Sequence, residues 1–183
     1  NTDLICASNV ICHVPNLNNL IEAVDLLLSK NGTFIFEEPY LGAMFEKVSY
    51  DQIYDEHIFM FSASSVLKIF KKYNLYLVDA IPQITHGGSM RYVIKRNNSD
   101  NSNNLNKLLD DEDKKKINHI DSCLEFKKNC EISKNKIKEK IESYKKKGKS
   151  ICGYAATSKS TTILNYCDIG TEYIDYICDT TKE

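Results

Sequence analysis

Two short apolar runs separated by an amphipathic segment constrain the fold of this chain most strongly. The runs at residues 4–8 and 33–36 lack polar alternation, so they predict two buried strands. Between them, apolar residues recur at helical spacing over residues 17–28; Asn16 is the predicted N-cap, and the Asn-Gly pair at 31–32 is predicted to end the helix. Strand, helix and strand with short loops predict a parallel crossover unit, and hence an α/β sheet.

The next elements predict the edge of that sheet. Ser62 is a second candidate N-cap, followed by a helix with its apolar residues on one face. Residues 75–78 and 90–94 are two further apolar strands, separated by a loop rather than a helix. A helix followed by two loop-connected strands indicates an antiparallel pair at the sheet edge.

The second half of the chain predicts a separate crossover unit. Residues 97–106 are rich in Asn, Ser and Asp and are predicted to form a linker. Residues 114–147 are predicted to form one long helix with a narrow apolar stripe. A strand at 150–155, a helix at 163–167 and a strand at 173–177 then repeat the strand, helix, strand pattern.

Composition excludes several classes of function. The net charge of -1 gives no electrostatic case for binding nucleic acid or an acidic membrane. No stretch approaches the ~18 apolar residues of a membrane span. The seven cysteines are odd in number and form no C-x-x-C pair. We therefore expect free thiols, a cytoplasmic protein and no metal site in this segment. The sequence specifies no oligomeric state.

Tyr54, Glu56 and His57 form the first candidate site. A neutral imidazole with a pKa near ~6.5 can remove a proton that an adjacent carbonyl has acidified. A carboxylate could orient the ring and a phenol could donate a hydrogen bond. A surface loop with a charge pair and a core tyrosine is the alternative interpretation. His13 follows a parallel strand, where open α/β sheets bind ligands, but it could instead cap the next helix.

Two further segments are candidate anion sites. In the first, adjacent glycines let the backbone approach a ligand with its amides; the alternative is a tight turn or bulge. The second is a turn into a helix, where amides and a cation suit a phosphate; the alternative is an ordinary crossover turn. Neither has the spacing of a Walker or G-x-G-x-x-G loop. Their residues are His86, Gly87, Gly88 and Ser89 in the first, and Thr157, Ser158, Lys159 and Ser160 in the second.

Taken together, these motifs resemble the sugar-nucleotide C-methyltransferases. These S-adenosylmethionine enzymes methylate carbon 3 of dTDP-4-keto-deoxysugars. The matching segments occur in order along the whole chain. They are residues 9–15 (NVICHVP), 38–41 (EPYL), 50–57 (YDQIYDEH), 86–91 (HGGSMR) and 153–162 (GYAATSKSTT).

The resemblance implies a division into parts. Residues 1–96 would be the second half of a Rossmann-like methyltransferase domain, 97–149 a linker with the long helix, and 150–183 the truncated start of a carboxyl-terminal α/β domain that binds the sugar nucleotide. The family's amino-terminal zinc region and the first half of its methyltransferase sheet would lie outside this chain. The residues that bind S-adenosylmethionine would lie there too, so this piece alone is expected to be inactive. The cysteines present do not correspond to the family's zinc ligands.

The resemblance also implies roles for individual residues. His57 would remove the C3 proton, while Glu56 and Tyr54 would orient it and steady the developing oxyanion. His13 would contact the sugar in the same pocket. The implied substrate contacts are His86, Gly87, Gly88, Ser89 and Arg91 along the sugar–phosphate cleft, and Thr157, Ser158, Lys159 and Ser160 at the nucleotide.

Three alternatives stay open. A small-molecule O- or N-methyltransferase would not need a second crossover unit after a long helix. A sugar-nucleotide-binding module without methyl transfer would not need Tyr54, Glu56 and His57. A nicotinamide-dependent dehydrogenase or epimerase would require a G-x-G-x-x-G turn, which this chain lacks.

Overall fold

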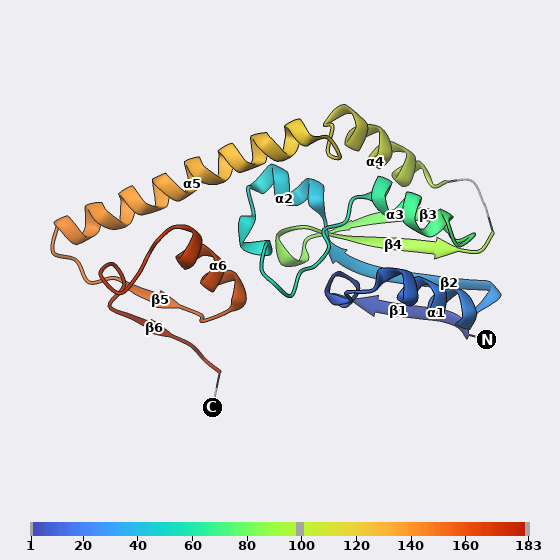
Figure 1. Cartoon of the computed structure of the whole chain (residues 1–183), viewed down its shortest axis with the longest axis horizontal. Helices are drawn as coiled ribbons and strands as arrows, with labels where there is room; N and C mark the ends of the chain where they lie inside the picture. The colour runs from blue at the N-terminus through green and yellow to red at the C-terminus, as the bar shows by residue number, and fades with distance from the viewer. Residues whose placement is uncertain (1, 98–100, 182–183) are drawn as a thin grey trace. The chain divides into compact units, whose positions relative to one another are not determined.

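A computed structural model describes residues 2–97 and 101–181, which divide into two compact units (Figure 1). Unit 1 comprises Asn1–Lys47 and Asp55–Cys123, and unit 2 comprises Val48–Tyr54 and Leu124–Glu183. The part boundaries at 96/97 and 149/150 follow from the family resemblance and stay predictions.

Unit 1 is a mixed sheet with helices, as the sequence predicts. The strand order is β1-β2-β4-β3; β1 runs parallel to β2, and β4 runs antiparallel to both β2 and β3. The parallel crossover and the antiparallel strand pair are therefore confirmed. The elements are β1 (Thr2–Ser8), η1 (Ile11–His13), α1 (Leu17–Leu27), β2 (Leu28–Pro39), α2 (Leu41–Lys47), α3 (Ala63–Lys71), β3 (Tyr76–Gln83), η3 (Thr85–Gly87), β4 (Ser89–Lys95) and α4 (Asn103–Lys114).

Two predicted caps are confirmed in atomic detail. The side chain of Asn16 accepts a hydrogen bond from the amide of Asn19 at 3.1 Å, which begins α1. Ser62 and Ser65 form a reciprocal capping box at the start of α3, each hydroxyl accepting the other residue's amide. Local side-chain chemistry therefore determines where both helices begin.

Two predictions about the first crossover are wrong. The predicted strand at 4–8 is formed but not buried: Leu4 is 55% exposed, because among the described residues β1 is an edge strand, paired with β2 alone. The helix does not end at Asn31 and Gly32, which lie inside β2. Pairing with β1 begins already at Leu28, so the chain leaves the helix there and becomes extended.

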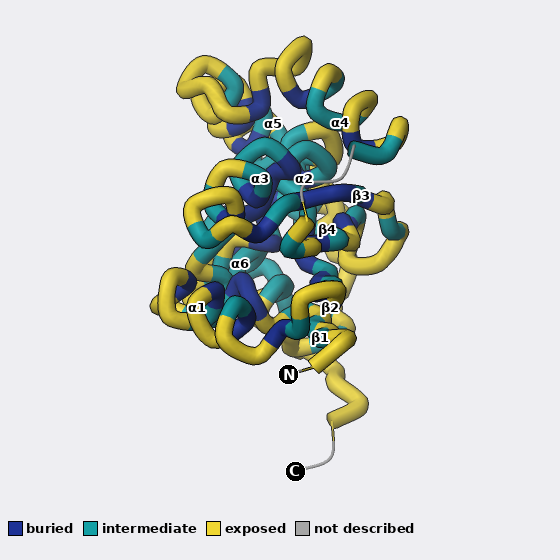
Figure 2. The backbone as a smooth tube through the Cα atoms, turned by 90° about the vertical axis from the view of Figure 1, so that its right-hand side faces the viewer, coloured by how far each residue is buried: buried dark blue, intermediate teal, exposed yellow. Residues whose placement is uncertain are grey.

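The core of unit 1 lies on the sheet face that α1 and α3 cover (Figure 2). Phe34 and Phe36 of β2 are almost fully buried, and Phe36 stacks on Phe70 of α3 with ring centroids 5.6 Å apart. Tyr92 of β4 is also fully buried, 4.9 Å from the Phe36 ring. These large aromatic side chains supply much of the apolar area that holds α3 against the sheet.

The predicted linker and long helix are only partly correct. Residues 98–100 of the linker lie outside the described residues. Residues 103–106 belong to α4, which Ser102 caps and whose Leu105 is fully buried. The long helix, α5 (Ile120–Lys146), begins six residues after the predicted start at 114. A turn separates it from α4, with Lys116 at a positive φ of 51°.

A buried carboxylate joins α4 to the start of α3. The Glu112 side chain is 2% exposed and accepts hydrogen bonds from Tyr40 Oη at 3.0 Å and from the amides of Ala63 and Ser64 at 2.7 and 2.9 Å. The Ser64 hydroxyl also donates to it. Burial raises the pKa of Tyr40, and the charge of Glu112 raises it further, so this phenol stays a donor.

Unit 2 contains the second crossover. Its elements are η2 (Tyr50–Gln52), the α5 residues from Leu124 onward, β5 (Cys152–Tyr154), α6 (Ser158–Tyr166) and β6 (Tyr176–Cys178), and β5 pairs parallel with β6. This confirms the predicted strand, helix, strand unit. The Asp175 carboxylate accepts hydrogen bonds from Lys145, from the Ser150 hydroxyl and from the Ile151 amide, and so connects α5 to the start of the second crossover. These bonds lower the pKa of Asp175, and the bond from Lys145 has the largest effect.

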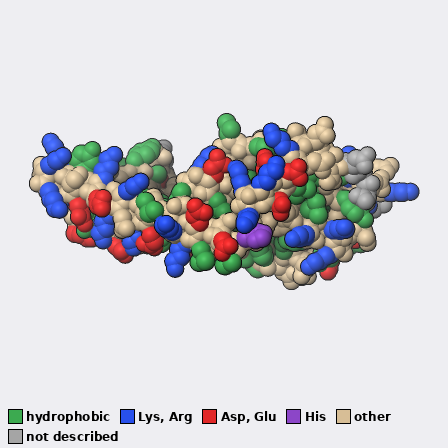
Figure 3. Space-filling model, turned by 90° about the horizontal axis from the view of Figure 1, so that it is seen from above, with side chains coloured by type: hydrophobic (Ala, Val, Ile, Leu, Met, Phe, Trp, Pro, Cys, Tyr) green, Lys and Arg blue, Asp and Glu red, His purple; other side chains and the backbone are tan. Residues whose placement is uncertain are grey.

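The described surface carries mixed charge. On the face shown in Figure 3, Lys and Arg side chains are interspersed with Asp and Glu. Among the described helices, none combines the length and apolar character that crossing a membrane requires.

Candidate functional site

One edge of the unit 1 sheet gathers several of the predicted site residues. Ser8, the last residue of β1, pairs with Glu37 of β2, and Pro39 at the end of β2 pairs with Ser89 at the start of β4. The segment with His13 and the turn that precedes Ser89 therefore emerge at the same edge. This is the carboxyl edge of the parallel pair, where open α/β sheets bind ligands.

The structure brings His13 and His57 together. Their ring centroids lie 4.9 Å apart with the planes tilted by 60°. Nδ1 of His13 lies 2.8 Å from the carbonyl oxygen of Glu56. Because a carbonyl can only accept, Nδ1 carries the proton, and Nε2 of His13 is left as an acceptor. Both rings are half-buried and thus remain accessible to a ligand.

Main-chain hydrogen bonds connect the two histidine segments. The carbonyl oxygen of Cys12 accepts from the amides of Ile58 and Phe59 at 2.9 and 3.2 Å. Cys12 directly precedes His13, and Ile58 directly follows His57. The relative position of the two imidazoles is therefore determined by the backbone as well as by side-chain packing.

Glu38 anchors the segment with His13 to β2. Its side chain is fully buried, and its Oε1 accepts from the amides of Val10 and Ile11 at 2.9 and 2.6 Å. These amides open the short helical turn η1 that ends at His13. The sequence motif contained Glu38, but its anchoring role spans 27 residues to Ile11 and depends on the parallel pairing of β1 with β2.

Glu56 and Tyr54 are placed differently. The Glu56 contact with His13 is made by its main-chain carbonyl, while its side chain is exposed. Tyr54 is half-buried and belongs to unit 2. Within unit 1, then, the structure groups His13, His57 and the Glu56 backbone.

The run from His86 to Ser89 forms a tight turn. His86, Gly87 and Gly88 have positive φ values of 51, 80 and 133°. Lys47 donates a hydrogen bond to the carbonyl of Gly87, and the buried Ser89 hydroxyl donates to the Thr85 carbonyl at 3.2 Å. The alternative interpretation of a tight turn therefore explains the two glycines structurally.

Gly88→Ala is expected to destabilise unit 1 by about 2–3 kcal/mol. A Cβ atom there would lie 2.5 Å from Cβ of Ala43, at a φ of +133° that other residues rarely adopt. Gly148→Ala is the control: its φ is +67° and nothing lies within 4 Å, so only the backbone penalty of about 1 kcal/mol remains. The urea midpoints of the two variants check this. Equal midpoints would remove the steric argument.

Arg91 already has an acidic partner. Its Nε and Nη2 lie 3.2 and 2.9 Å from Oε2 of Glu37, and Thr85 Oγ1 donates to Oε1 of Glu37 at 2.9 Å. Sequence reasoning missed Glu37. Any anion that binds Arg91 would have to share its guanidinium with this carboxylate.

In the second candidate anion site, residues 157–160, the side-chain hydroxyls form hydrogen bonds at the start of α6. Thr157 is the N-cap of α6 and accepts from the Ser160 amide at 3.3 Å. The preceding amide, that of Ala156, donates to Asp179 at 2.6 Å. Bonds from Thr181 and the Ala156 amide lower the pKa of Asp179 to about 2, so a negative charge already lies at this turn. Ser158 is exposed and Lys159 is half-buried.

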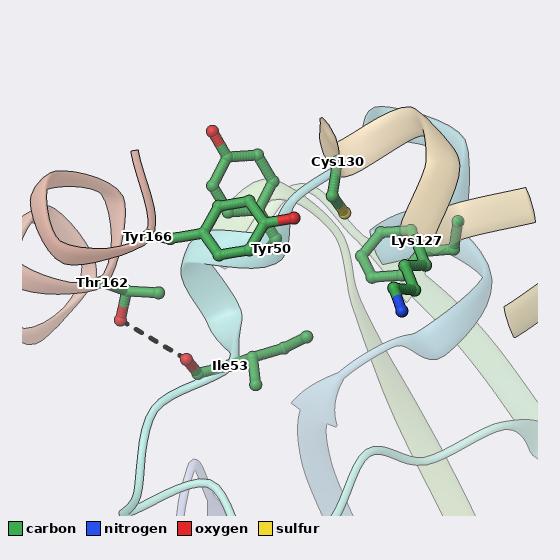
Figure 4. A pocket seen from close by; sticks show the side chains of 7 residues that line it. Tyr50, Ile53, Lys127, Cys130, Thr162 and Tyr166 are labelled. Atoms are coloured by element: carbon green, nitrogen blue, oxygen red, sulfur yellow. Dashed lines mark hydrogen bonds between the residues drawn. The ribbon is translucent and has the colours of Figure 1, made fainter. Parts of the chain in front are cut away.

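Unit 2 also contains an apolar cavity of about 300 Å³ that sequence reasoning missed (Figure 4). Tyr50 and Tyr166 form one wall, with ring centroids 5.0 Å apart. Thr162 Oγ1 lies 3.4 Å from the carbonyl of Ile53. Burial and the neighbouring Cys167 raise the pKa of Tyr50 to about 12. The lining residues are Tyr50, Ile53, Phe126, Lys127, Cys130, Thr162 and Tyr166.

Comparison with known proteins identifies the family. Residues 84–183 match the C-methyltransferase C-terminal domain, and residues 1–80 match a methyltransferase domain. The chain belongs to the C-methyltransferase family. The first match of this C-methyltransferase chain ends inside β3 and the second begins directly after β3, so the boundary lies within one sheet.

A curated relative of this C-methyltransferase chain covers the same region. C-methyltransferase NovU of Streptomyces niveus is 27% identical over 180 residues, which are 97% of this chain and 43% of NovU. The chain thus spans less than half the length of that relative. These findings confirm the predicted family at the level of C-methyltransferase, and the mixed α/β unit agrees with a Rossmann-like methyltransferase fold.

Proposed function

We propose that the complete protein transfers a methyl group from S-adenosylmethionine to carbon 3 of a dTDP-linked 4-keto-deoxysugar. One observation carries this proposal: the paired imidazoles of His13 and His57 lie at the carboxyl edge of the parallel strands in a chain of the C-methyltransferase family. Forming a carbon–carbon bond requires a carbon nucleophile, and a base beside an acidified C–H bond generates one.

His57 is the base in this proposal. The 4-keto group acidifies the proton on C3, and a half-buried neutral imidazole accepts it, leaving an enolate whose carbon is the nucleophile. His13 donates its Nδ1–H to the carbonyl oxygen of Glu56. Its Nε2 can therefore accept a hydrogen bond from a sugar hydroxyl and orient the ring against His57. Tyr54 and the Glu56 carboxylate support the base and the developing oxyanion.

The cofactor would bind at this same edge of the sheet. The parallel ends of β1 and β2, with the anchored 9–13 segment, are chemically suited to a ligand there. By the resemblance, the glycine-rich loop and acidic residue that bind the cofactor would lie outside this chain, and so would the zinc region. When bound, S-adenosylmethionine supplies an electrophilic methyl group; this chain supplies the base and its positioning.

The proposal keeps the substrate contacts that the resemblance implies. The turn from His86 to Ser89, with Arg91, borders the sugar and its phosphates, and residues 157–160 approach the nucleotide. Asp179 and Glu37 limit how much positive charge each region offers, so main-chain amides and hydroxyls would make most contacts. Neither nucleic acid nor a membrane is a partner in this proposal. We place the activity in the cytoplasm, consistent with seven free thiols.

Isotope labelling of the product tests the proposal. The complete protein is incubated with S-adenosylmethionine carrying a ¹³C methyl group and with a dTDP-4-keto-6-deoxyhexose. The proposal predicts a labelled methyl group on C3 in the product NMR spectrum. A label on oxygen or nitrogen would indicate a different methyltransferase. Substrate binding with no label transferred would favour a sugar-nucleotide-binding module.

A further inference from the structure

Cys12, His13 and His57 form a cluster of soft donor atoms that the proposed reaction does not fully use. One donor atom from each residue lies within 4.8 Å of the other two. Cys12 is 1% exposed, and the two histidines are half-buried. No sequence spacing revealed this cluster, because tertiary contacts place His57 beside two residues more than forty positions earlier.

The cluster is preorganised by hydrogen bonds outside it. The Cys12 carbonyl accepts hydrogen bonds from the amides of Ile58 and Phe59, and these bonds fix the segment with Cys12 and His13 against the segment with His57. His13 donates Nδ1–H to the Glu56 carbonyl, so its Nε2 presents a lone pair. Metal-binding histidines typically donate their second ring N–H to a carbonyl or carboxylate in this manner.

The buried carboxyl group of Glu38, which binds the main chain just before Cys12, is a second, independent observation. Glu38 is fully buried, and its Oε2 has no hydrogen-bond partner among the residues that the structure describes. A buried carboxylate oxygen without a partner is a costly group that an ion would stabilise.

We propose that Cys12, His13 and His57 bind a thiophilic divalent cation of the zinc class. A tetrahedral zinc site with one sulfur and two nitrogen ligands needs ligand atoms roughly 3.3–3.6 Å apart. The widest separation in the cluster, up to 4.8 Å, exceeds this by about 1.2–1.5 Å, which rotations of the three side chains would have to close. The S–H bond of Cys12 breaks as the sulfur–metal bond forms, and one proton is released to solvent. The fourth position stays open, and magnesium and calcium are disfavoured because they prefer oxygen ligands.

The consequence for activity rests on the proposed function. A cation held by His57 occupies the lone pair that would accept the C3 proton. Zinc is therefore expected to inhibit the enzyme, and a saturating keto-sugar substrate is expected to protect it. The binding itself does not depend on this consequence.

Cobalt substitution tests the site without using activity. The complete protein is titrated with Co²⁺, and absorption by the sulfur-to-cobalt charge-transfer band is recorded against the Cys12→Ser and Cys123→Ser variants. Cys123 is an exposed thiol in the same unit and serves as the matched control. The wild type and Cys123→Ser should show one equivalent of Co²⁺ more than Cys12→Ser, with a thiolate band that Cys12→Ser lacks. Any zinc already bound elsewhere in the protein is common to all three.

A second variant keeps the test valid if Cys12→Ser, a change at a buried position, fails to fold. His57→Asn changes a half-buried loop residue, retains the thiolate band and should bind Co²⁺ at least about tenfold more weakly. Identical stoichiometry and spectra in wild type and Cys12→Ser would overturn the site, as would unchanged affinity in His57→Asn. A cobalt site in a protein without methyl transfer would keep this site and reject the proposed function. Methyl transfer without the cobalt band would do the reverse.

Discussion

Replacing His57 by Asn is expected to lower kcat of the complete enzyme by about 10²–10⁴-fold, the range that a general base contributes. Asn is a planar side chain of similar size, but it cannot accept and hold a proton near neutral pH. Binding of the keto-sugar should change little, because the base contributes mainly to the transition state. Steady-state kinetics together with a direct measurement of substrate affinity separate these two effects.

His119→Asn is the matched control for this experiment. His119 is an exposed residue of the same unit, outside the cluster of His13 and His57. The same substitution there should leave both kcat and affinity near the wild-type values. A His57→Asn enzyme with near-normal kcat would remove His57 from the role of base, whatever its effect on affinity.

Glu112→Ala is expected to cost about 3 kcal/mol or more of stability in unit 1. The change removes the acceptor of four hydrogen bonds, from Tyr40 Oη, the Ala63 and Ser64 amides, and the Ser64 hydroxyl. Hydrogen bonds to a charged group contribute about 1.5–3 kcal/mol each, and buried donors left without a partner add a further cost. The carboxylate also lies at the start of α3, where the helix dipole favours a negative charge.

Hydrogen exchange gives the most local measurement of this effect. The amides of Ala63 and Ser64 should exchange much faster in Glu112→Ala, and the urea midpoint should fall. Glu112→Gln keeps one carbonyl acceptor and should lie between Glu112→Ala and the wild type. Asp110→Ala, an exposed change on the same helix, should stay within about 0.5 kcal/mol. Equal destabilisation by Glu112→Ala and Asp110→Ala would contradict the structural role of Glu112.

Local signals predicted much of the fold. Asn16 and Ser62 begin helices because their side chains accept amides only three residues away. The Asn-Gly pair at 31–32 wrongly predicted the end of the first helix, because parallel pairing with β1 holds that backbone extended as part of β2. Leu105 has the helical apolar spacing of α4 with Leu108 and Leu109, but the polar composition around it indicated a linker.

The candidate site was predictable only in part. Sequence position at the end of a strand correctly placed His13 at the carboxyl edge of the parallel strands, and its contact with the Glu56 carbonyl brings it beside His57. Glu38 and Glu112 act across 27 and 49 residues of sequence, through contacts that exist only once the sheet and helices have packed. Residue type and spacing cannot indicate which distant amides a carboxylate will accept.

Deuterium exchange at C3 tests the central claim most directly. A dTDP-4-keto-6-deoxyhexose is incubated in heavy water with the complete protein or its His57→Asn variant, at saturating substrate, and C3 is followed by NMR. The proposed function predicts exchange with the wild type that His57→Asn abolishes. Exchange that persists in His57→Asn would assign the base to another residue. No exchange above background with either protein, under demonstrated saturation, would contradict enolisation of this substrate.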